Sequence, residues 1–401
     1  MKKFIAMLLA CLMVIGMFAG CGSNEAAETP DAEAPAAEAP AAEGAAPALK
    51  IGLTGPLTGD ASAYGIAVRG GMEIAVAEIN ALGGLQIEFK AEDDVADGSD
   101  IAVSAYNSLK DWGMQIFAGA VTTGSSLAIG AETANDQIFM LTPSASAVDV
   151  AMTGPNVYQM CFTDPNQGAS AAELMAEKWP DATIGVIYDA SDAYSTGIRD
   201  GFMTKAAELG LNIAVEDAAF TADTKTNLQT QVTQCKDAGC DLVFLPFYYT
   251  EAAQVLIYAD SIGYEPTFFG CDGMDGILTV DGFDGALAEG LVLMTPFDAN
   301  ATDEATVSFV EQFKANNDGL VPNQFAADGY DVIYALYNAC VAAGIDGNTD
   351  PADACAMLQE QFATLTVDGL TGKGMTWDEN GMISKAPAAV VVTDGVYVPL
   401  A

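Results

Sequence analysis

Short apolar runs alternate with longer amphipathic stretches along the chain from residue 48 onward. Runs of this length, bounded by glycine, proline and aspartate, predict buried strands, and the stretches between them predict covering helices. One helix is expected from residue 64 to 82, where Val68, Met72 and Val76 recur at helical spacing. The expected strands are residues 49–53, 86–93, 115–120, 138–142, 183–189, 241–247 and 267–273.

This alternation predicts an α/β fold in which doubly wound parallel sheets are covered by helices on both faces. The number of strand and helix units in the 401 residues exceeds what one sheet comfortably holds, so we expect two α/β lobes. No repeat of fixed period is visible, which argues against a solenoid or a propeller.

The first 47 residues have a different composition from the rest. Lys2 and Lys3 precede an apolar run at residues 4–19, which predicts a signal peptide over residues 1–20. The run ends in FAGC, which is similar to a bacterial lipobox, so Cys21 is expected to become the lipidated first residue. The alternative is an ordinary secretory signal. Residues 21–47 are otherwise rich in Ala, Glu and Pro and are expected to form a tether.

The charge balance and the absence of one residue type exclude several classes of function. With 14 Lys and Arg against 55 Asp and Glu, the net charge of −41 repels nucleic acid and favours a solvated surface or an adaptation to salt. The chain has no histidine, which excludes Ser-His-Asp and Cys-His catalysis and every zinc site that needs histidine. We expect no catalytic residue, no metal and no cofactor.

Six of the eight cysteines remain once the signal is removed and Cys21 is lipidated. In an oxidising compartment such cysteines are candidates for disulfides. Two lie in apolar runs, where a buried free thiol is at least as well supported as a bridge. The two expected disulfides join Cys235 to Cys240 and Cys340 to Cys355.

The stretch LTGPLTGDASAYG at residues 53–65 joins the first expected strand to the first expected helix. It matches neither a Walker loop nor a dinucleotide fingerprint, and a plain structural turn is one interpretation. The other is a ligand loop, because backbone N–H groups and Tyr64 would lie at the carboxyl end of the sheet, where open α/β folds bind ligands. Similar hydroxyl, aromatic and acidic clusters follow other expected strands, at residues 121–126, 142–146, 188–194, 246–251 and 270–273.

Those clusters combine hydroxyls, rings and one carboxylate, which suits a zwitterion with an apolar side chain. At this point residues 48–401 resemble the type I periplasmic binding proteins, specifically the branched-chain amino acid group of ABC importers. The motifs that carry the resemblance are KIGLTGPLTGDASAYG (50–65), GGMEIAVAEINALGG (70–84), EDDVADG (92–98), LTPSASA (141–147), YDASDAYSTG (188–197), FFGCDG (268–273), DGYDVIYAL (328–336) and MTWDENG (375–381).

The resemblance implies two lobes that are joined by three crossing segments and close on a ligand by a hinge motion. The N-terminal lobe would hold residues 48–164 and 296–385, and the C-terminal lobe residues 165–295 and 386–401. Such a protein is expected to be an extracytoplasmic monomer, lipid-anchored here, and not an enzyme. It would deliver an amino acid, branched-chain or another small aliphatic one, to a membrane permease.

The resemblance also assigns roles to individual residues. Asp272 would pair with the ligand ammonium, with Tyr194 on the same side. Val95 and Thr122 stand where some relatives carry a cysteine pair, so the first-lobe disulfide of those relatives is not expected. The carboxylate-binding hydroxyls would be those of Thr123, Ser144 and Ser146, and the side-chain pocket would be lined by Tyr64, Tyr248 and Phe325.

Two other functions stay open at this point. The pair Asp93 and Asp94 would suit a carboxylate-based hydrolase, although their place after a strand favours solvated turn residues. A receptor of the same fold would also serve as the sensory partner of a membrane receptor, and sequence alone does not separate sensing from transport.

Overall fold

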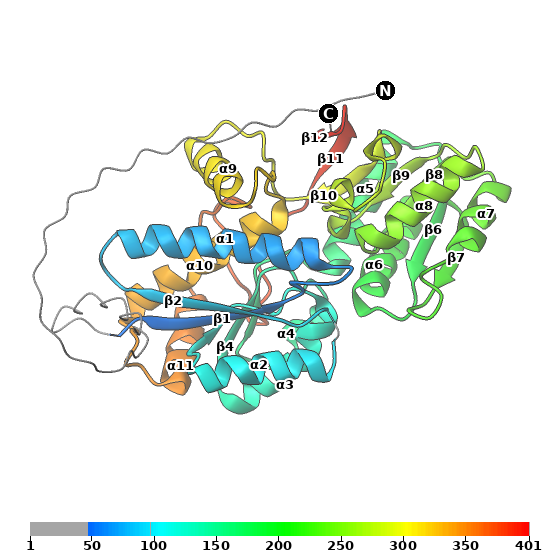
Figure 1. Ribbon diagram of the computed structural model, residues 1–401. Helices are drawn as coiled ribbons and strands as arrows, with labels where there is room; N and C mark the ends of the chain where they lie inside the picture. The colour runs from blue at the N-terminus through cyan, green and yellow to red at the C-terminus, as the bar shows by residue number, and fades with distance from the viewer. Residues whose placement is uncertain (1–46, 97, 401) are drawn as a thin grey trace, which may run out of the picture. The chain divides into compact units, whose positions relative to one another are not determined.

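The computed structural model describes residues 47–96 and 98–400 (Figure 1). The predicted signal peptide, the lipidation site Cys21 and the tether up to residue 46 lie outside the described residues. Within the described part of the chain, no helix is both long enough and apolar enough to span a membrane.

The first sheet is parallel and has the strand order β2-β1-β3-β4-β5. Leu49, Ile51 and Leu53 of its interior strand β1 are fully buried, as expected for a strand covered on both faces. The strands are β1 (Leu49–Gly55), β2 (Ile87–Asp93), β3 (Ile116–Phe117), β4 (Phe139–Thr142) and β5 (Val157–Gln159).

Helices cover both faces of this sheet. Figure 1 shows α1 and α10 on one face and α2 and α3 on the other. Met72 and Ile79 of α1 belong to the same core as β1, whereas Tyr106 and Leu109 of α2 pack in a separate core with Phe117. The helices are α1 (Ser62–Ala81), α2 (Asp100–Trp112), α3 (Thr123–Asp136), α4 (Val148–Ala151), α9 (Glu304–Asn316), α10 (Gln324–Ala343) and α11 (Pro351–Phe362).

The second sheet has the order β12-β11-β10-β9-β8-β6-β7. Strands β6 to β10 run parallel, and β11 and β12 complete the sheet as an antiparallel hairpin beside β10. The strands are β6 (Thr183–Asp189), β7 (Asn212–Phe220), β8 (Leu242–Leu245), β9 (Thr267–Gly270), β10 (Val292–Thr295), β11 (Ala388–Thr393) and β12 (Val396–Pro399). Its helices are α5 (Asp164–Lys178), α6 (Ala193–Leu209), α7 (Gln229–Asp237) and α8 (Tyr249–Ser261).

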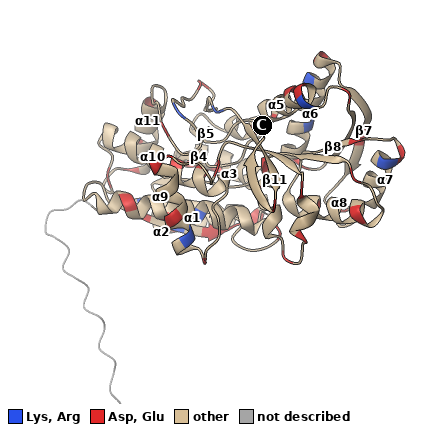
Figure 2. Ribbon diagram, turned by 90° about the horizontal axis from the view of Figure 1, so that it is seen from above, with Lys and Arg blue, Asp and Glu red and all other residues tan. Residues whose placement is uncertain are grey.

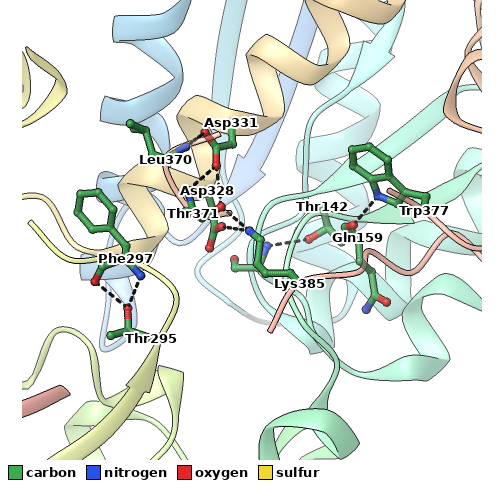
Figure 3. Close-up of polar contacts among 11 residues, drawn as sticks. Thr142, Gln159, Thr295, Phe297, Asp328, Asp331, Leu370, Thr371, Trp377 and Lys385 are labelled. Atoms are coloured by element: carbon green, nitrogen blue, oxygen red, sulfur yellow. Dashed lines mark hydrogen bonds and ion pairs between the residues drawn. The ribbon is translucent and has the colours of Figure 1, made fainter. Parts of the chain in front are cut away.

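The chain passes between the two sheets three times, after β5, after β10 and before β11. The predicted fold class, two parallel-sheet lobes joined by three segments, is therefore confirmed. Figure 3 shows the polar contacts of the crossings. The Thr295 hydroxyl accepts a hydrogen bond from the Phe297 N–H at 3.2 Å, and the Trp377 indole N–H donates to the Gln159 carbonyl at 2.8 Å.

The third crossing is fixed by a buried ion pair. The Lys385 ammonium lies 2.7 Å from a carboxylate oxygen of Asp328 on α10 and donates to the Thr371 hydroxyl at 2.5 Å (Figure 3). Thr371 in turn donates its hydroxyl and its N–H to Asp331. Burial raises the pKa of Asp328 to about 7, although the neighbouring ammonium opposes that shift. A charge buried in this way depends on its partner, because removing one member leaves the other desolvated.

Acidic residues are spread over the helices of both sheets, with Lys and Arg scattered between them (Figure 2). The charge does not gather on one element. This distribution agrees with the solvated acidic surface that was expected from the net charge of −41.

The expected disulfides are absent, which corrects the sequence-based prediction. All six cysteines in the described residues are free and buried. Cys235 and Cys240 are neighbours at the end of α7, and a hydrogen bond from the Cys235 thiol to Cys240 raises the pKa of Cys235 and lowers that of Cys240. Cys340 and Cys355 pack as apolar side chains in the core around α10 and α11.

Candidate functional site

Seven of the eight residues assigned by the resemblance line a single cavity. It measures about 20 Å³, which is room for about one water molecule. An amino acid therefore enters only when the walls separate. The lining residues are Tyr64, Val121, Thr122, Thr123, Ser144, Tyr194, Tyr248, Asp272, Gly273 and Phe325.

Asp272 lies directly after β9 and forms the acidic wall of the cavity. Its side chain is buried, with 4% of the residue exposed. One carboxylate oxygen, Oδ1, accepts hydrogen bonds from the Tyr194 hydroxyl at 2.5 Å, the Gln167 amide at 2.9 Å and the Gly273 N–H at 2.9 Å. Burial raises the pKa of Asp272, and the hydrogen bonds from Tyr194 and Gln167 oppose the rise. These three donors hold Oδ1, so Oδ2 is the oxygen left for a ligand cation.

Gln167 and Gln324 support Asp272, and sequence reasoning did not single out either of them. Gln167, in the first turn of α5, accepts a hydrogen bond from the Asp272 N–H at 2.6 Å in addition to donating to its carboxylate. Gln324, at the start of α10, donates its side-chain amide to the Asp272 carbonyl at 3.0 Å. The only signal in the sequence was a polar residue at the start of each helix pattern, which is too common to identify a site.

The opposite wall is the N-terminus of α3. Thr122 is its N-cap residue but makes no side-chain cap hydrogen bond, and Thr122 and Thr123 both have buried hydroxyls without a partner. The Ser144 hydroxyl donates to the Val121 carbonyl at 2.7 Å. Buried polar groups are almost always paired, and helix N-termini attract anions through unpaired N–H groups and the helix dipole. This wall is therefore suited to a ligand carboxylate.

Ser146 is the assigned residue that the structure does not bring into the cavity. It is fully buried, and its carbonyl accepts a hydrogen bond from the Asp164 N–H at 3.0 Å. Its hydroxyl has no hydrogen-bond partner, and the same is true of both carboxyl oxygens of Asp164. Burial raises the pKa of Asp164. Ser146 belongs to this buried pair and not to the cavity lining.

Aromatic rings close the remainder of the cavity. Tyr194 and Tyr248 stack with centroids 4.9 Å apart and ring planes at 4°, and the centroids of Tyr64 and Phe325 are 4.5 Å apart. The Tyr64 hydroxyl donates to the Gly273 carbonyl at 2.5 Å. Because Tyr64 is in the first turn of α1 and Gly273 is in the turn that follows β9, this hydrogen bond joins the two lobes across the cavity.

The acid pair Asp93 and Asp94 lies apart from the cavity lining. Asp93 accepts hydrogen bonds from the Leu57 N–H at 2.8 Å and from the Thr58 hydroxyl at 2.6 Å, so it holds the turn after β1. Asp94 is fully buried, which corrects the prediction of a solvated residue, and burial raises its pKa to about 6. Both carboxylates thus serve the structure of their own loops.

The family model for periplasmic binding proteins matches residues 48–395, so the chain belongs to that family. It is of type I and of the branched-chain amino acid group, as the resemblance indicated, and this is a family of solute-binding proteins and not of enzymes.

Three comparisons illustrate the relationship. The leucine-, isoleucine-, valine-, threonine- and alanine-binding protein of Pseudomonas aeruginosa is 27% identical over 343 residues, which cover 84% of this chain and 87% of the relative. The structure of the leucine-binding protein LivK from Thermotoga maritima has a TM-score of 0.77 and 26% identity, covering 88% of this chain and 98% of that one. LivJ from Streptococcus pneumoniae in complex with isoleucine has a TM-score of 0.77 and 25% identity, with the same coverage.

Proposed function

We propose that the protein binds an amino acid, branched-chain or another small aliphatic one, in the cavity between Asp272 and the N-terminus of α3. The observation that carries the proposal is the polarity of the two walls. A buried carboxylate faces one side, and unpartnered hydroxyls at a helix N-terminus face the other. An α-amino acid presents the complementary pair of charges on one carbon atom, and the relatives named above bind such molecules.

Binding would be coupled to closure of the cleft. The cavity is too small for an amino acid to enter by diffusion, so the walls must separate and then close around the ligand. The ligand ammonium would take the open oxygen of Asp272, and the ligand carboxylate would take the hydroxyls of Thr122 and Thr123. Each charge is then paired as water is excluded, which makes the closed form the favoured one when ligand is present.

The closed protein would deliver its ligand to the permease of an ABC importer. The protein would act as a monomer outside the cytoplasm. Anchoring through a lipid on Cys21 and the tether agrees with the composition of residues 1–47. Because the cleft changes shape on binding, a permease can distinguish loaded from empty receptor by contacts to both lobes.

The test uses three molecules that share the isobutyl side chain of leucine. Leucine carries both charges, 3-methylbutylamine lacks the carboxylate, and 4-methylpentanoate lacks the ammonium. At 100 times its dissociation constant a ligand stabilises the folded state by about 2.7 kcal/mol, which raises the unfolding midpoint by several degrees. We expect leucine to raise the midpoint and both truncated molecules to fail.

The same measurement on Asp272→Asn separates the site from the fold. This variant keeps the shape but not the charge, so leucine should bind at least about tenfold more weakly. Asp237→Asn, at the exposed end of α7, removes one charge elsewhere and should bind leucine like the parent. If 4-methylpentanoate stabilises as well as leucine, the zwitterion proposal is overturned.

A further inference from the structure

A second and much larger cavity lies beside the crossing that follows β10. It measures about 440 Å³, against about 20 Å³ for the cavity at Asp272, and falls in the range of 300–1,000 Å³ that is usual for small-molecule sites. Its walls come from the crossing itself, the loop between α9 and α10, and the hairpin of β11 and β12. The apolar lining residues include Leu278, Phe297, Val321, Pro322, Val390 and Val396.

Two polar groups in the lining of this cavity have no hydrogen-bond partner. Asp275 is buried, with 3% of the residue exposed, and it lines the cavity. Its Oδ2 accepts a hydrogen bond from the Gln324 N–H at 3.0 Å, whereas its Oδ1 is buried and has no partner. The hydroxyl of Tyr397, which also lines the cavity, is likewise buried and unpaired. Buried groups of this kind usually have a hydrogen-bond partner, and leaving a carboxylate oxygen unpaired is costly.

The chemistry of the lining selects the kind of molecule that fits. An apolar body would contact the walls, and a hydrogen-bond donor, best a cation, would meet Oδ1 of Asp275. An anion is disfavoured at this end because the carboxylate repels it. The other charged residues of the lining are Asp298 and the exposed Lys314, which do not change the sign of the buried end.

We propose that this cavity is a second binding site, separate from the amino acid cavity, for a small hydrophobic amine whose ammonium pairs with Asp275. The amino acid cavity offers a carboxylate and an anion-binding helix end together. The second cavity offers a buried carboxylate among apolar walls, with Asp298 and the exposed Lys314 as its other charged residues, so its ligand needs no carboxyl group.

The probe is cyclohexylmethylamine, and cyclohexylmethanol is the control with the same shape and no charge. Calorimetric titration at pH 8 keeps the amine of the probe protonated and the Asp275 carboxyl mostly ionised, since burial raises the pKa of Asp275 to about 7. We expect the amine to bind with one-to-one stoichiometry and the alcohol to bind at least about tenfold more weakly, as for a hydrogen bond to a charged group.

Three variants locate the amine. Asp275→Asn should weaken amine binding at least about tenfold, and Asp237→Asn on exposed α7 should leave it unchanged. Val396→Trp places a large ring at the cavity mouth, and because Val396 is 54% exposed this change leaves the core intact. It should weaken binding even if Asp275→Asn fails to fold.

Several results would overturn the proposal. One is the absence of amine binding to the parent protein, and another is equal affinity for amine and alcohol. A third is full amine binding by both Asp275→Asn and Val396→Trp. Amine binding that is lost in Asp272→Asn and kept in Asp275→Asn would place the probe in the amino acid cavity, which also refutes a second site.

Discussion

Gln167 and Asp272 hold each other through two hydrogen bonds of opposite direction. The Gln167 amide donates to the Asp272 carboxylate at 2.9 Å, and the Asp272 N–H donates to the Gln167 side-chain oxygen at 2.6 Å. Both residues are buried. A helix of the second lobe thereby fixes the orientation of the carboxylate that we assign to the ligand ammonium.

Replacing Gln167 should weaken ligand binding without direct contact to the ligand. Gln167→Met keeps the length of the side chain but removes both hydrogen bonds, so Asp272 loses its orientation and its N–H is left unpaired. We expect calorimetry to show leucine binding about 10-fold to 100-fold more weakly. Gln234→Met on the exposed side of α7 is the matched control, and equal affinity of the two variants would contradict the positioning role.

The hydrogen bond from Tyr64 to Gly273 should contribute to closure. Tyr64→Phe keeps the ring that packs on Phe325 at 4.5 Å but leaves the Gly273 carbonyl without its donor across the cavity. Leucine affinity should fall about tenfold, because a buried carbonyl then loses its partner in the closed form. In the control, Tyr337→Phe on α10 removes a hydroxyl that lies outside the cavity. A loss of similar size in both variants would count against closure.

The Lys385 and Asp328 pair should stabilise the fold at neutral pH more than in acid. Lys385→Met leaves Asp328 buried without its ammonium, which should lower the free energy of unfolding by about 3–5 kcal/mol at pH 8. The loss should be smaller at pH 5, where Asp328, with a pKa raised to about 7, becomes neutral.

Urea unfolding at both pH values measures this effect. Lys385→Met combined with Asp328→Asn should recover most of the stability, because neither charge then remains buried. Arg69→Met breaks an exposed pair with Glu73 at 3.7 Å and should change the free energy of unfolding by less than about 1 kcal/mol. A Lys385→Met variant as stable as Arg69→Met would show that the buried pair has no such role.

Buried acids should make the protein more stable at pH 5 than at pH 8. Burial raises the pKa of Asp275 and Asp328 to about 7 and that of Asp94 to about 6. Between its ordinary pKa and its raised pKa, each group holds a proton in the folded state that the unfolded state has released. Stability therefore falls as pH rises through this window, by about 1.4 kcal/mol per pH unit for each such proton.

Thermal unfolding at pH 5, 6, 7 and 8 checks the sign of this dependence. Glu92 and Asp93, whose pKa values are lowered, contribute stability that is lost only as pH falls below about 4, outside this range. Asp275→Asn should flatten the curve. A midpoint that rises with pH from 5 to 8 would rule out this account of the buried acids.

The strands that the sequence predicts well are those with unbroken apolar runs. β1, β4, β6 and β8 begin and end within about two residues of their predicted bounds, because a strand that is covered on both faces needs apolar side chains in most positions. β2 was also predicted to within about one residue, although it is an edge strand with one buried residue. β7 was missed because it lies at the sheet edge and alternates polar with buried residues. β5 has only 3 residues, too few for a pattern, whereas β10 was missed although it is as short and as buried as β4.

The sequence predicted the site residues that follow strands, but not the residues that hold those side chains in position. Thr123, Tyr194 and Asp272 follow strands of parallel sheets, so topology alone brings them together. Gln167 acts through Asp272 from a helix start, where no strand end signals it. Ser146, two residues beyond Ser144, is fully buried and does not line the cavity, a difference that the sequence does not signal.

The hairpin at the end of the chain has a consequence for biosynthesis. β11 and β12, residues 388–399, complete the sheet that began at residue 183, while α10, residues 324–343, covers the sheet that began at residue 49. A nascent chain therefore cannot finish either lobe until nearly all of it has left the ribosome, and contacts of such long sequence separation form slowly. Because of this connectivity, neither lobe can complete its fold for most of the synthesis of the chain. An incompletely folded chain is the state in which a protein can pass through a translocation channel.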